Sequence, residues 1–229
     1  MVVIVGEVRG ERAAQLLRRL GWGRMAVDAY FRPYPGEPWG FDNGAFRDWK
    51  RGRPFDGDAF LRRLERAVRL GRPYLAVAPD LVAGGTRSLD FSLAWLEGGR
   101  LPPDWPWYLA VQDGMGLADV AAVLDRFAGI FLGGTDRFKA TAWHWAELAR
   151  SRGKKFHYAR AGTARKVARA LLVGADSLDS SFPLWTTGRL AGFARALAAP
   201  CQRALWPPAA YSPHPDEFCR QNPAGVFPA

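Results

Sequence analysis

Short apolar segments alternate with segments of helical periodicity along most of this 229-residue chain. This alternation restricts the possible folds more than any other feature of the sequence. The apolar segments are rich in β-branched and aromatic residues, as buried strands are. We expect eight strands: Val2–Val5, Met25–Tyr30, Gly40–Phe46, Tyr74–Asp80, Trp107–Gln112, Gly129–Gly133, Lys155–Arg160 and Ala175–Ser180. Strands that alternate with helices are typical of a parallel sheet.

Apolar residues at three- and four-residue spacing predict helices between most of these strands. The predicted helices are Arg12–Leu20, Ala59–Leu70, Leu89–Leu96, Leu117–Phe127, Thr141–Arg152 and Thr163–Val173. Helix N-caps are expected at Asp58, Ser88 and Thr163, and helix ends at Gly71, Gly98, Gly153 and Gly174. Eight strands with intervening helices predict a single (β/α)8 TIM-like barrel over residues 1–200. A doubly wound open sheet is the alternative.

The segment after residue 200 differs from the rest of the chain. It is rich in Pro, lacks periodicity and contains Cys201, His214 and Cys219. Because it is too small to fold alone, we expect 201–229 to be an irregular extension packed on the barrel. A structural zinc site needs four ligands, so we expect neither a metal nor another cofactor.

The cellular location follows from cysteine content and hydropathy. Two Cys cannot form a disulfide framework, and no apolar run approaches the roughly 18 residues that cross a bilayer. The sequence therefore predicts a cytoplasmic protein without a membrane partner.

The chain is strongly basic, with 32 basic and 22 acidic residues and a net charge of +10. All but five of the basic residues are Arg, which binds phosphate in a bidentate manner, so a nucleic acid is the expected partner. A GC-rich genome would also enrich Arg. No acidic residue lies between Glu147 and Asp176, where eight basic residues occur: Arg150, Arg152, Lys154, Lys155, Arg160, Arg165, Lys166 and Arg169. We expect these eight residues to cluster around the seventh strand and its helix, beside Asp179, with Arg160, Arg165 and Lys166 in contact with phosphates. A solvated helix face is the alternative.

Polar residues gather where the predicted strands end. They include Asp42, Asn43, Asp80, Gln112, Asp113, Thr135, His157, Arg160 and Asp179. The carboxyl ends of barrel strands form one mouth, where active sites lie, so we expect these side chains to converge there. A single Asp in such a place is explained equally well as a turn former, but the whole set is not.

The same strings resemble the tRNA-guanine transglycosylase superfamily over about Phe41 to Ser181. Four segments are similar to family motifs, which are given in parentheses: Asp42–Phe46 (Asp-Ser-Gly-Gly-Phe), Val111–Gly114 (Val-Gln-Gly-Gly), Phe131–Gly134 (Ile-Gly-Gly) and Gly174–Ser180 (Gly-(Ile/Val)-Asp-x-Phe-Asp-Cys). Gly133–Lys139 and His157–Arg160 resemble strings of short phage and bacterial relatives linked to 7-deazaguanine insertion into DNA.

The resemblance implies that a guanine in a nucleic acid is exchanged for a free 7-deazaguanine base such as 7-cyano-7-deazaguanine. It assigns Asp179 as the nucleophile, through a covalent sugar intermediate, and Asp42 as the general acid and base. The implied base-binding residues are Phe46, Asp80, Gln112, Gly133, Gly134 and His157. The alternatives are a core position for Phe46 and a purely structural role for His157. Asp176 is expected to be structural.

The chain also departs from the family. It lacks the Cys-rich zinc run and the RNA-binding accessory domains of tRNA-type members, which favours DNA over tRNA as the polymer. Asp113 stands where the family has Gly, which leaves the accepted base open. Three further functions remain as alternatives: hydrolysis of the base without exchange, nucleic-acid binding without catalysis, and a reaction on small phosphorylated sugars with Gly133 and Gly134 near the phosphate.

Overall fold

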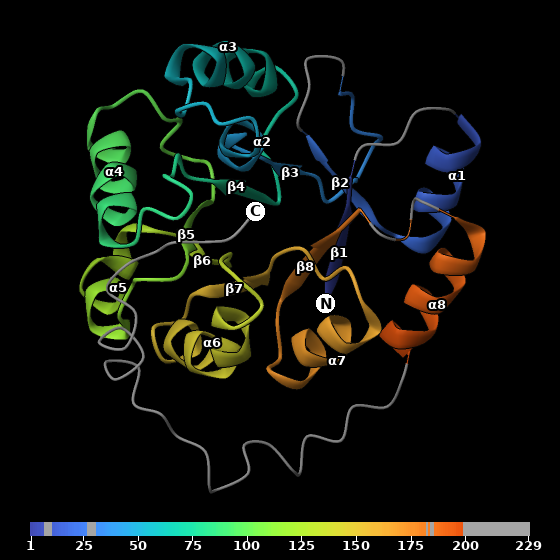
Figure 1. Cartoon of the computed structure of the whole chain (residues 1–229). Coiled ribbons are helices and arrows are strands. Elements are labelled where there is room, and N and C mark those ends of the chain that lie inside the picture. The colour runs from blue at the N-terminus through green and yellow to red at the C-terminus, as the bar shows by residue number, and fades with distance from the viewer. Residues whose placement is uncertain (7–10, 27–30, 182, 184–185, 199–229) are drawn as a thin grey trace, which may run out of the picture.

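A computed structural model describes residues 1–6, 11–26, 31–181, 183 and 186–198. Eight parallel strands form a closed barrel in chain order, surrounded by helices (Figure 1). The strand ladder from Val2–Ser177 to Val5–Ser180 joins the first strand to the last. This closure confirms the (β/α)8 barrel and excludes the open sheet. The predicted extension over 201–229, with Cys201, His214 and Cys219, lies outside the described residues.

The helices and strands have the following bounds. The strands are β1 Val2–Val5, β2 Gly23–Ala26, β3 Gly40–Phe41, β4 Leu75–Val77, β5 Trp107–Val111, β6 Gly129–Leu132, β7 Lys155–Tyr158 and β8 Ser177–Ser180. The helices are α1 Glu11–Leu20, α2 Ala45–Lys50, α3 Gly57–Val68, α4 Thr86–Glu97, α5 Leu117–Val123, α6 Ala142–Ser151, α7 Ala164–Leu172 and α8 Thr187–Ala198, with 3-10 turns η1 Leu124–Arg126 and η2 Phe138–Thr141.

Alternate residues of each strand face the barrel interior and the helices. A small interior cluster is formed by Ile4, Met25, Leu75, Val77, Tyr108 and Ala110. The larger cluster between strands and helices includes Val3, Val5, Leu109, Val111, Phe156 and Leu178. Because successive side chains of a strand point to opposite faces, this alternation turns His157, Ser177 and Asp179 toward the interior. The alternation of apolar residues in β7 and β8 thus determines that His157 and Asp179 point into the barrel.

Strands β1 and β8 end where the sequence predicts, whereas β3 to β7 end earlier, most clearly β3. The chain leaves β3 after Phe41 and turns at Gly44, whose φ is +82°. Helix α2 then carries Phe46, which was predicted to be in the strand. Glycine adopts this left-handed conformation without the steric cost that a Cβ adds. Helix α8 was not predicted.

The predicted helix ends are partly correct. Thr163 caps α7, since its hydroxyl accepts a hydrogen bond from Lys166 N–H, as predicted. The predictions for Asp58 and Ser88 are wrong: Asp56 caps α3 and Gly85 precedes α4. All four glycines expected to end helices lie within three residues after one: Gly71, Gly98, Gly153 and Gly174.

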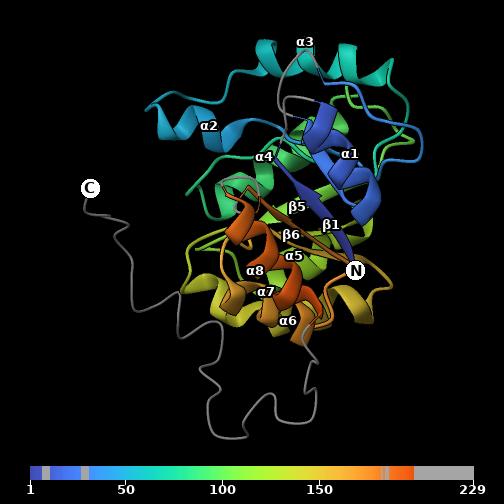
Figure 2. The same ribbon diagram turned by 90° about the vertical axis from the view of Figure 1, so that its right-hand side faces the viewer.

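Helix α2 is displaced along the barrel axis, toward the end of the barrel opposite the N-terminus (Figure 2). This end carries the loops that follow the carboxyl ends of the strands, and it is called the mouth below. Within the described ranges, no helix is long and apolar enough to span a membrane.

Candidate active site

Asp179 lies on the inner face of β8, near the mouth. Its Oδ1 accepts hydrogen bonds from His157 Nε2, at 3.0 Å, and from the backbone N–H of Arg160, also at 3.0 Å. Burial acts to raise the pKa of Asp179, but these hydrogen bonds and nearby positive charge outweigh it and hold the pKa below its usual value. Asp179 is therefore an ionised carboxylate at neutral pH.

His157 supports this carboxylate from within the barrel. Its ring is fully buried and stacks on Phe131, with centroids 4.7 Å apart and planes 7° from parallel. Its Nε2 is hydrogen-bonded to Asp179, and its Nδ1 is hydrogen-bonded to the Ser177 hydroxyl, at 2.8 Å. A fully buried ring has no surface to offer a base. The predicted base-contacting role of His157 does not fit this geometry, and the structural alternative does.

Asp42 follows β3 and is half-buried at the mouth. Its Oδ1 accepts a hydrogen bond from Gly44 N–H, at 2.5 Å. Burial raises the pKa of Asp42, and the negative charge of Asp179 raises it further, against the effect of the Gly44 hydrogen bond. The charge of Asp179 thus acts on Asp42 at one mouth, and the pKa values of the two acids are shifted in opposite directions. This is the arrangement expected of a proton donor paired with an ionised carboxylate.

Asp80 follows β4 and is tied to the β3 loop by Asn43. The Asn43 amide donates to Asp80 Oδ1 and to the Ala78 carbonyl, both at 2.7 Å, and accepts from Ala45 N–H. Burial raises the pKa of Asp80 to about 7, and the charge of Asp42 contributes to the increase. Asn43 was expected at the mouth, but its hydrogen bond to Asp80 was not predicted, and its place directly after Asp42 was the available signal.

Asp80 is expected to make stability fall as pH rises. An unfolded Asp has a pKa near ~3.9, whereas the pKa of folded Asp80 is raised to about 7. Between these values the folded protein holds a proton that the unfolded chain has released, so each step up in pH favours unfolding. Asp80→Asn keeps the acceptor for Asn43 but cannot ionise.

The measurement is urea unfolding of wild type and Asp80→Asn from about pH 4 to 7.5. The wild-type free energy of unfolding should fall relative to the variant by up to about 4 kcal/mol over this range. Parallel pH curves for the two proteins would contradict the raised pKa.

Gln112 clamps a loop and does not present its amide to the mouth. Its Oε1 accepts from Ala83 N–H, at 2.7 Å, and its Nε2 donates to the Leu81 carbonyl, at 2.8 Å. Ala83 has a φ of +59°, a conformation that costs a non-glycine residue about 1–2 kcal/mol. Gln112 therefore restrains the β4–α4 loop, and the predicted contact with the base is not supported by this geometry.

Gly133 and Gly134 form a tight turn after β6. Gly133 N–H donates to the Val111 carbonyl of β5, at 2.9 Å. Gly134 has a φ of +74°, and a Cβ there would lie 2.6 Å from Asp113 Oδ2. The Asp113 carboxylate accepts from the Thr135 N–H and hydroxyl, both at 2.7 Å. Asp113, where the resembling family has Gly, therefore anchors this turn. The departure from the family motif was the signal for it.

Arg160 connects three parts of the mouth. Its N–H binds Asp179, its guanidinium donates to the Gly134 carbonyl at 2.8 Å, and the guanidinium carbon lies 4.4 Å from the centroid of the Phe46 ring. Its φ of +52° is strained for a side chain of this size. Such strain is common at functional sites.

Lys139 is a buried cation near the same loop, and the sequence analysis gave it no role. Its Nζ donates to the Ala159 carbonyl, at 2.5 Å. Burial lowers the pKa of Lys139 to about 7, and the charge of Arg160 adds to this effect. Because the side chain is 1% exposed, Lys139 supports the loop that carries Arg160 and does not reach a ligand.

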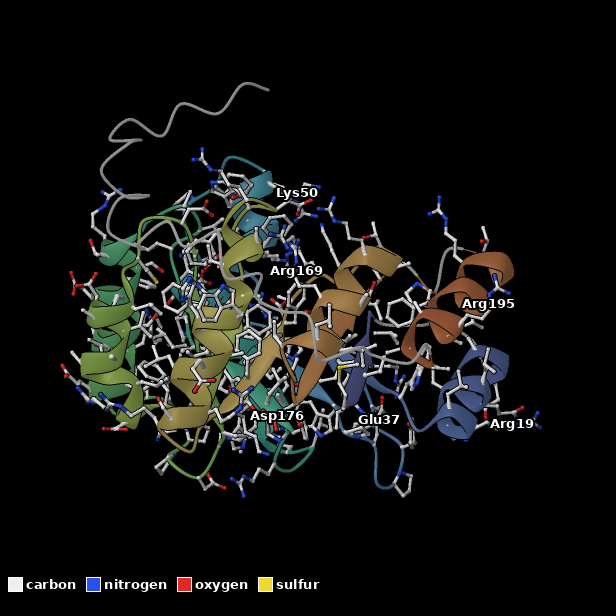
Figure 3. The ribbon with its side chains drawn as sticks, turned by 90° about the horizontal axis from the view of Figure 1, so that it is seen from below. Arg19, Glu37, Lys50, Arg169, Asp176 and Arg195 are labelled. Carbon is white, nitrogen blue, oxygen red and sulfur yellow. The ribbon has the colours of Figure 1, made fainter. Side chains whose placement is uncertain are left out.

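The eight basic residues from Arg150 to Arg169 do not form one patch beside Asp179. Four have contacts around the amino ends of the strands: Arg150 with Glu147, Arg152 and Lys154 with Asp125, and Lys155 with Asp176. Figure 3 shows Asp176 at the opposite end of the molecule from Lys50. The pattern was misleading because β7 separates the two groups along the barrel axis. The contacts of Asp176 with Lys155 and Phe156 N–H agree with its expected structural role.

The residues predicted to contact phosphates, Arg160, Arg165 and Lys166, lie at the mouth end of the barrel. Lys166 forms an ion pair with Asp136, at 2.7 Å, and Arg165 is exposed in the first turn of α7. Among the described residues, no group of three or more His, Cys, Asp or Glu is arranged to hold a metal.

The mouth therefore brings together Asp42, Asp80 and Asp179, as predicted. His157 instead supports Asp179, and Gln112 supports the β4–α4 loop. No protein-family model matches this chain, and no curated protein matches it in sequence.

Proposed function

We propose that this barrel is a transglycosylase that exchanges guanine for a 7-deazaguanine in a nucleic acid, with DNA favoured over tRNA. One observation carries the proposal: Asp42, whose pKa is raised in part by the charge of Asp179, shares one mouth with Asp179, whose pKa is lowered. An acid and an ionised carboxylate are the two groups that a retaining displacement at a sugar carbon needs.

In the first step, an Asp179 oxygen attacks C1′ of the nucleotide. The bond between C1′ and the purine nitrogen breaks, its electron pair stays on the purine, and protonated Asp42 gives the purine a proton. The products are free guanine and an ester between the sugar and Asp179. Because the hydrogen bonds from His157 and Arg160 both fall on Oδ1, the proposed attacking atom is Oδ2.

In the second step, ionised Asp42 takes a proton from a ring nitrogen of the incoming 7-deazaguanine. That nitrogen attacks C1′, the ester bond breaks, and Asp179 leaves as a carboxylate. Two inversions retain the configuration at the sugar. The His157 and Arg160 hydrogen bonds favour the ionised leaving group, so the same contacts serve both steps.

Base recognition is assigned to residues that border the two acids. Asp80, when ionised above its raised pKa of about 7, would accept hydrogen bonds from the N1–H and 2-amino group of guanine, a donor pair that a carboxylate matches. Phe46, at the rim, would stack on the extruded base, as aromatic residues commonly do. The net charge of +10 suits a polyanionic substrate, and the cysteine content agrees with a reaction in the cytoplasm.

The test is transfer of a labelled base into polymer. Guanine-containing DNA and tRNA are incubated separately with the protein and labelled guanine or 7-cyano-7-deazaguanine. We expect label to enter DNA at a higher rate than tRNA. Strand cleavage by mild alkali, without incorporated label, would show hydrolysis in place of exchange. The absence of both label and abasic sites, with a folded protein, would reject the proposal.

A further inference from the structure

Helix α2 carries two large aromatic side chains in contact with solvent. Phe46 is 37% exposed and Trp49 is 46% exposed. They lie three residues apart, on one side of the helix, and their rings stack with centroids 5.8 Å apart and planes 27° from parallel. Neighbouring exposed rings of this size on a soluble domain commonly mark a binding surface.

Cations surround this aromatic pair. The segment from Ala45 to Pro54 contains four basic residues and one acidic residue: Arg47, Lys50, Arg51, Arg53 and Asp48. The four basic residues are exposed. The Lys50 Nζ lies 5.8 Å from the Phe46 centroid, and Figure 3 shows Lys50 at the mouth end of the molecule. The surface therefore combines flat aromatic faces with positive charge.

One residue joins this surface to the proposed nucleophile. The Arg160 guanidinium lies over the Phe46 ring, while the Arg160 N–H binds Asp179. Strand β3, which leads into α2, and β7, which leads to Arg160, are four strands apart in the closed barrel of eight. The contact between Phe46 and Arg160 thus reaches across the mouth and places α2 beside the residue that binds Asp179.

We propose that Trp49, supported by the ring of Phe46 and surrounded by Arg47, Lys50, Arg51 and Arg53, forms a stacking shelf for an unpaired nucleic-acid strand. The shelf binds the nucleotides that flank the one in the mouth, so its place in catalysis rests on the proposed function. An unpaired base stacks on the face of Trp49 that is turned away from Phe46, and the cations contact the adjoining phosphates. The bases of a duplex already have both faces covered by their neighbours, so the shelf discriminates in favour of unpaired strands.

Other binding partners would use only some of the features of this surface. An acidic peptide would pair with the cations but gain little from the flat faces of the rings. A second copy of this chain, with its own charge of +10, would be repelled by the same cations. The combination of rings and positive charge therefore favours a nucleic-acid strand.

The test uses a fluorescent twelve-residue oligothymidine, which contains no guanine and is not a substrate for exchange. Binding is measured by anisotropy for wild type, Trp49→Ala, Trp49→Phe and Arg19→Ala. Arg19 lies on α1 (Figure 3) and is exposed, which makes it a matched control for loss of one surface residue. We expect Trp49→Ala to weaken binding about tenfold, Trp49→Phe to stay within about threefold of wild type, and Arg19→Ala to change binding less than about twofold.

Two further measurements complete the test. Duplex DNA of the same length should bind more weakly than the single strand and respond less to Trp49→Ala. The slope of log affinity against log salt should fall by about 0.7 in Lys50→Ala. Equal binding by wild type and Trp49→Ala, or an equal loss in Arg19→Ala, would overturn the shelf. Because oligothymidine cannot take part in exchange, this result is independent of whether guanine exchange occurs.

Discussion

Replacing Asp179 by Asn is expected to lower base exchange by about 10⁴-fold while DNA binding stays within about twofold of wild type. An amide is a poor nucleophile, so no sugar ester forms. Its oxygen still accepts the hydrogen bonds that His157 and Arg160 give to Oδ1 of Asp179, so the mouth keeps its shape. Single-turnover incorporation of labelled base measures exchange, and anisotropy measures binding.

Asp176→Asn is the matched control for this experiment. Asp176 lies just before the same strand but contacts Lys155 and Phe156 N–H at the opposite end of the barrel. Its replacement should leave exchange near the wild-type rate, with at most a loss of stability. Retention of a tenth or more of wild-type exchange by Asp179→Asn would remove Asp179 as the nucleophile.

Asp42→Asn is expected to lower exchange of ordinary guanine by about 10²–10⁴-fold, because the leaving purine is no longer protonated. A guanine methylated at N7 is already cationic and leaves without that proton. With this substrate, the first step should therefore recover in Asp42→Asn but not in Asp179→Asn. The second step still lacks a base, so the sugar ester should accumulate on the variant.

The pH profile gives a second signature of Asp42. Its protonated form acts in the first step, and its pKa is raised by burial and by Asp179. The first step should therefore slow as pH rises through that raised pKa, and this decline should be absent in Asp42→Asn with the methylated substrate. Equal inactivity of Asp42→Asn on both substrates would instead indicate that Asp42 only holds the turn at Gly44.

The barrel was predictable because its signal repeats along the chain. Several apolar runs that became strands, such as Gly40–Phe41 and Trp107–Val111, are followed by polar residues, and the parallel order follows from the intervening helices. The alternation of apolar and helical segments did not predict the residue at which each strand ends. Phe46 has high strand propensity, but the turn at Gly44 comes before it and places it on a helix. Local propensity was overridden there by tertiary structure.

The convergence of Asp42, Asp80 and Asp179 was predictable for the same reason, since the barrel brings strand ends together. The roles of the buried polar residues could not be predicted from the sequence. Gln112 and His157 occupy positions that suit base contact, but their side chains are used by the Ala83 loop and by Ser177 and Asp179. Such pairings join residues 20 or more positions apart and have no periodic signature. The run of basic residues also wrongly predicted a single patch, because β7 separates Lys155 from Arg160 by the height of the barrel.

Mass spectrometry of the protein, denatured after incubation with guanine-containing DNA, tests the central claim most directly. The proposed chemistry predicts a covalent adduct between the protein and a sugar that has lost its base, mapped to the peptide that contains Asp179 and absent from Asp179→Asn. The N7-methylated substrate should increase this adduct in Asp42→Asn. An adduct on any other residue, or base exchange that proceeds without an adduct, would contradict the assignment of Asp179 as the nucleophile.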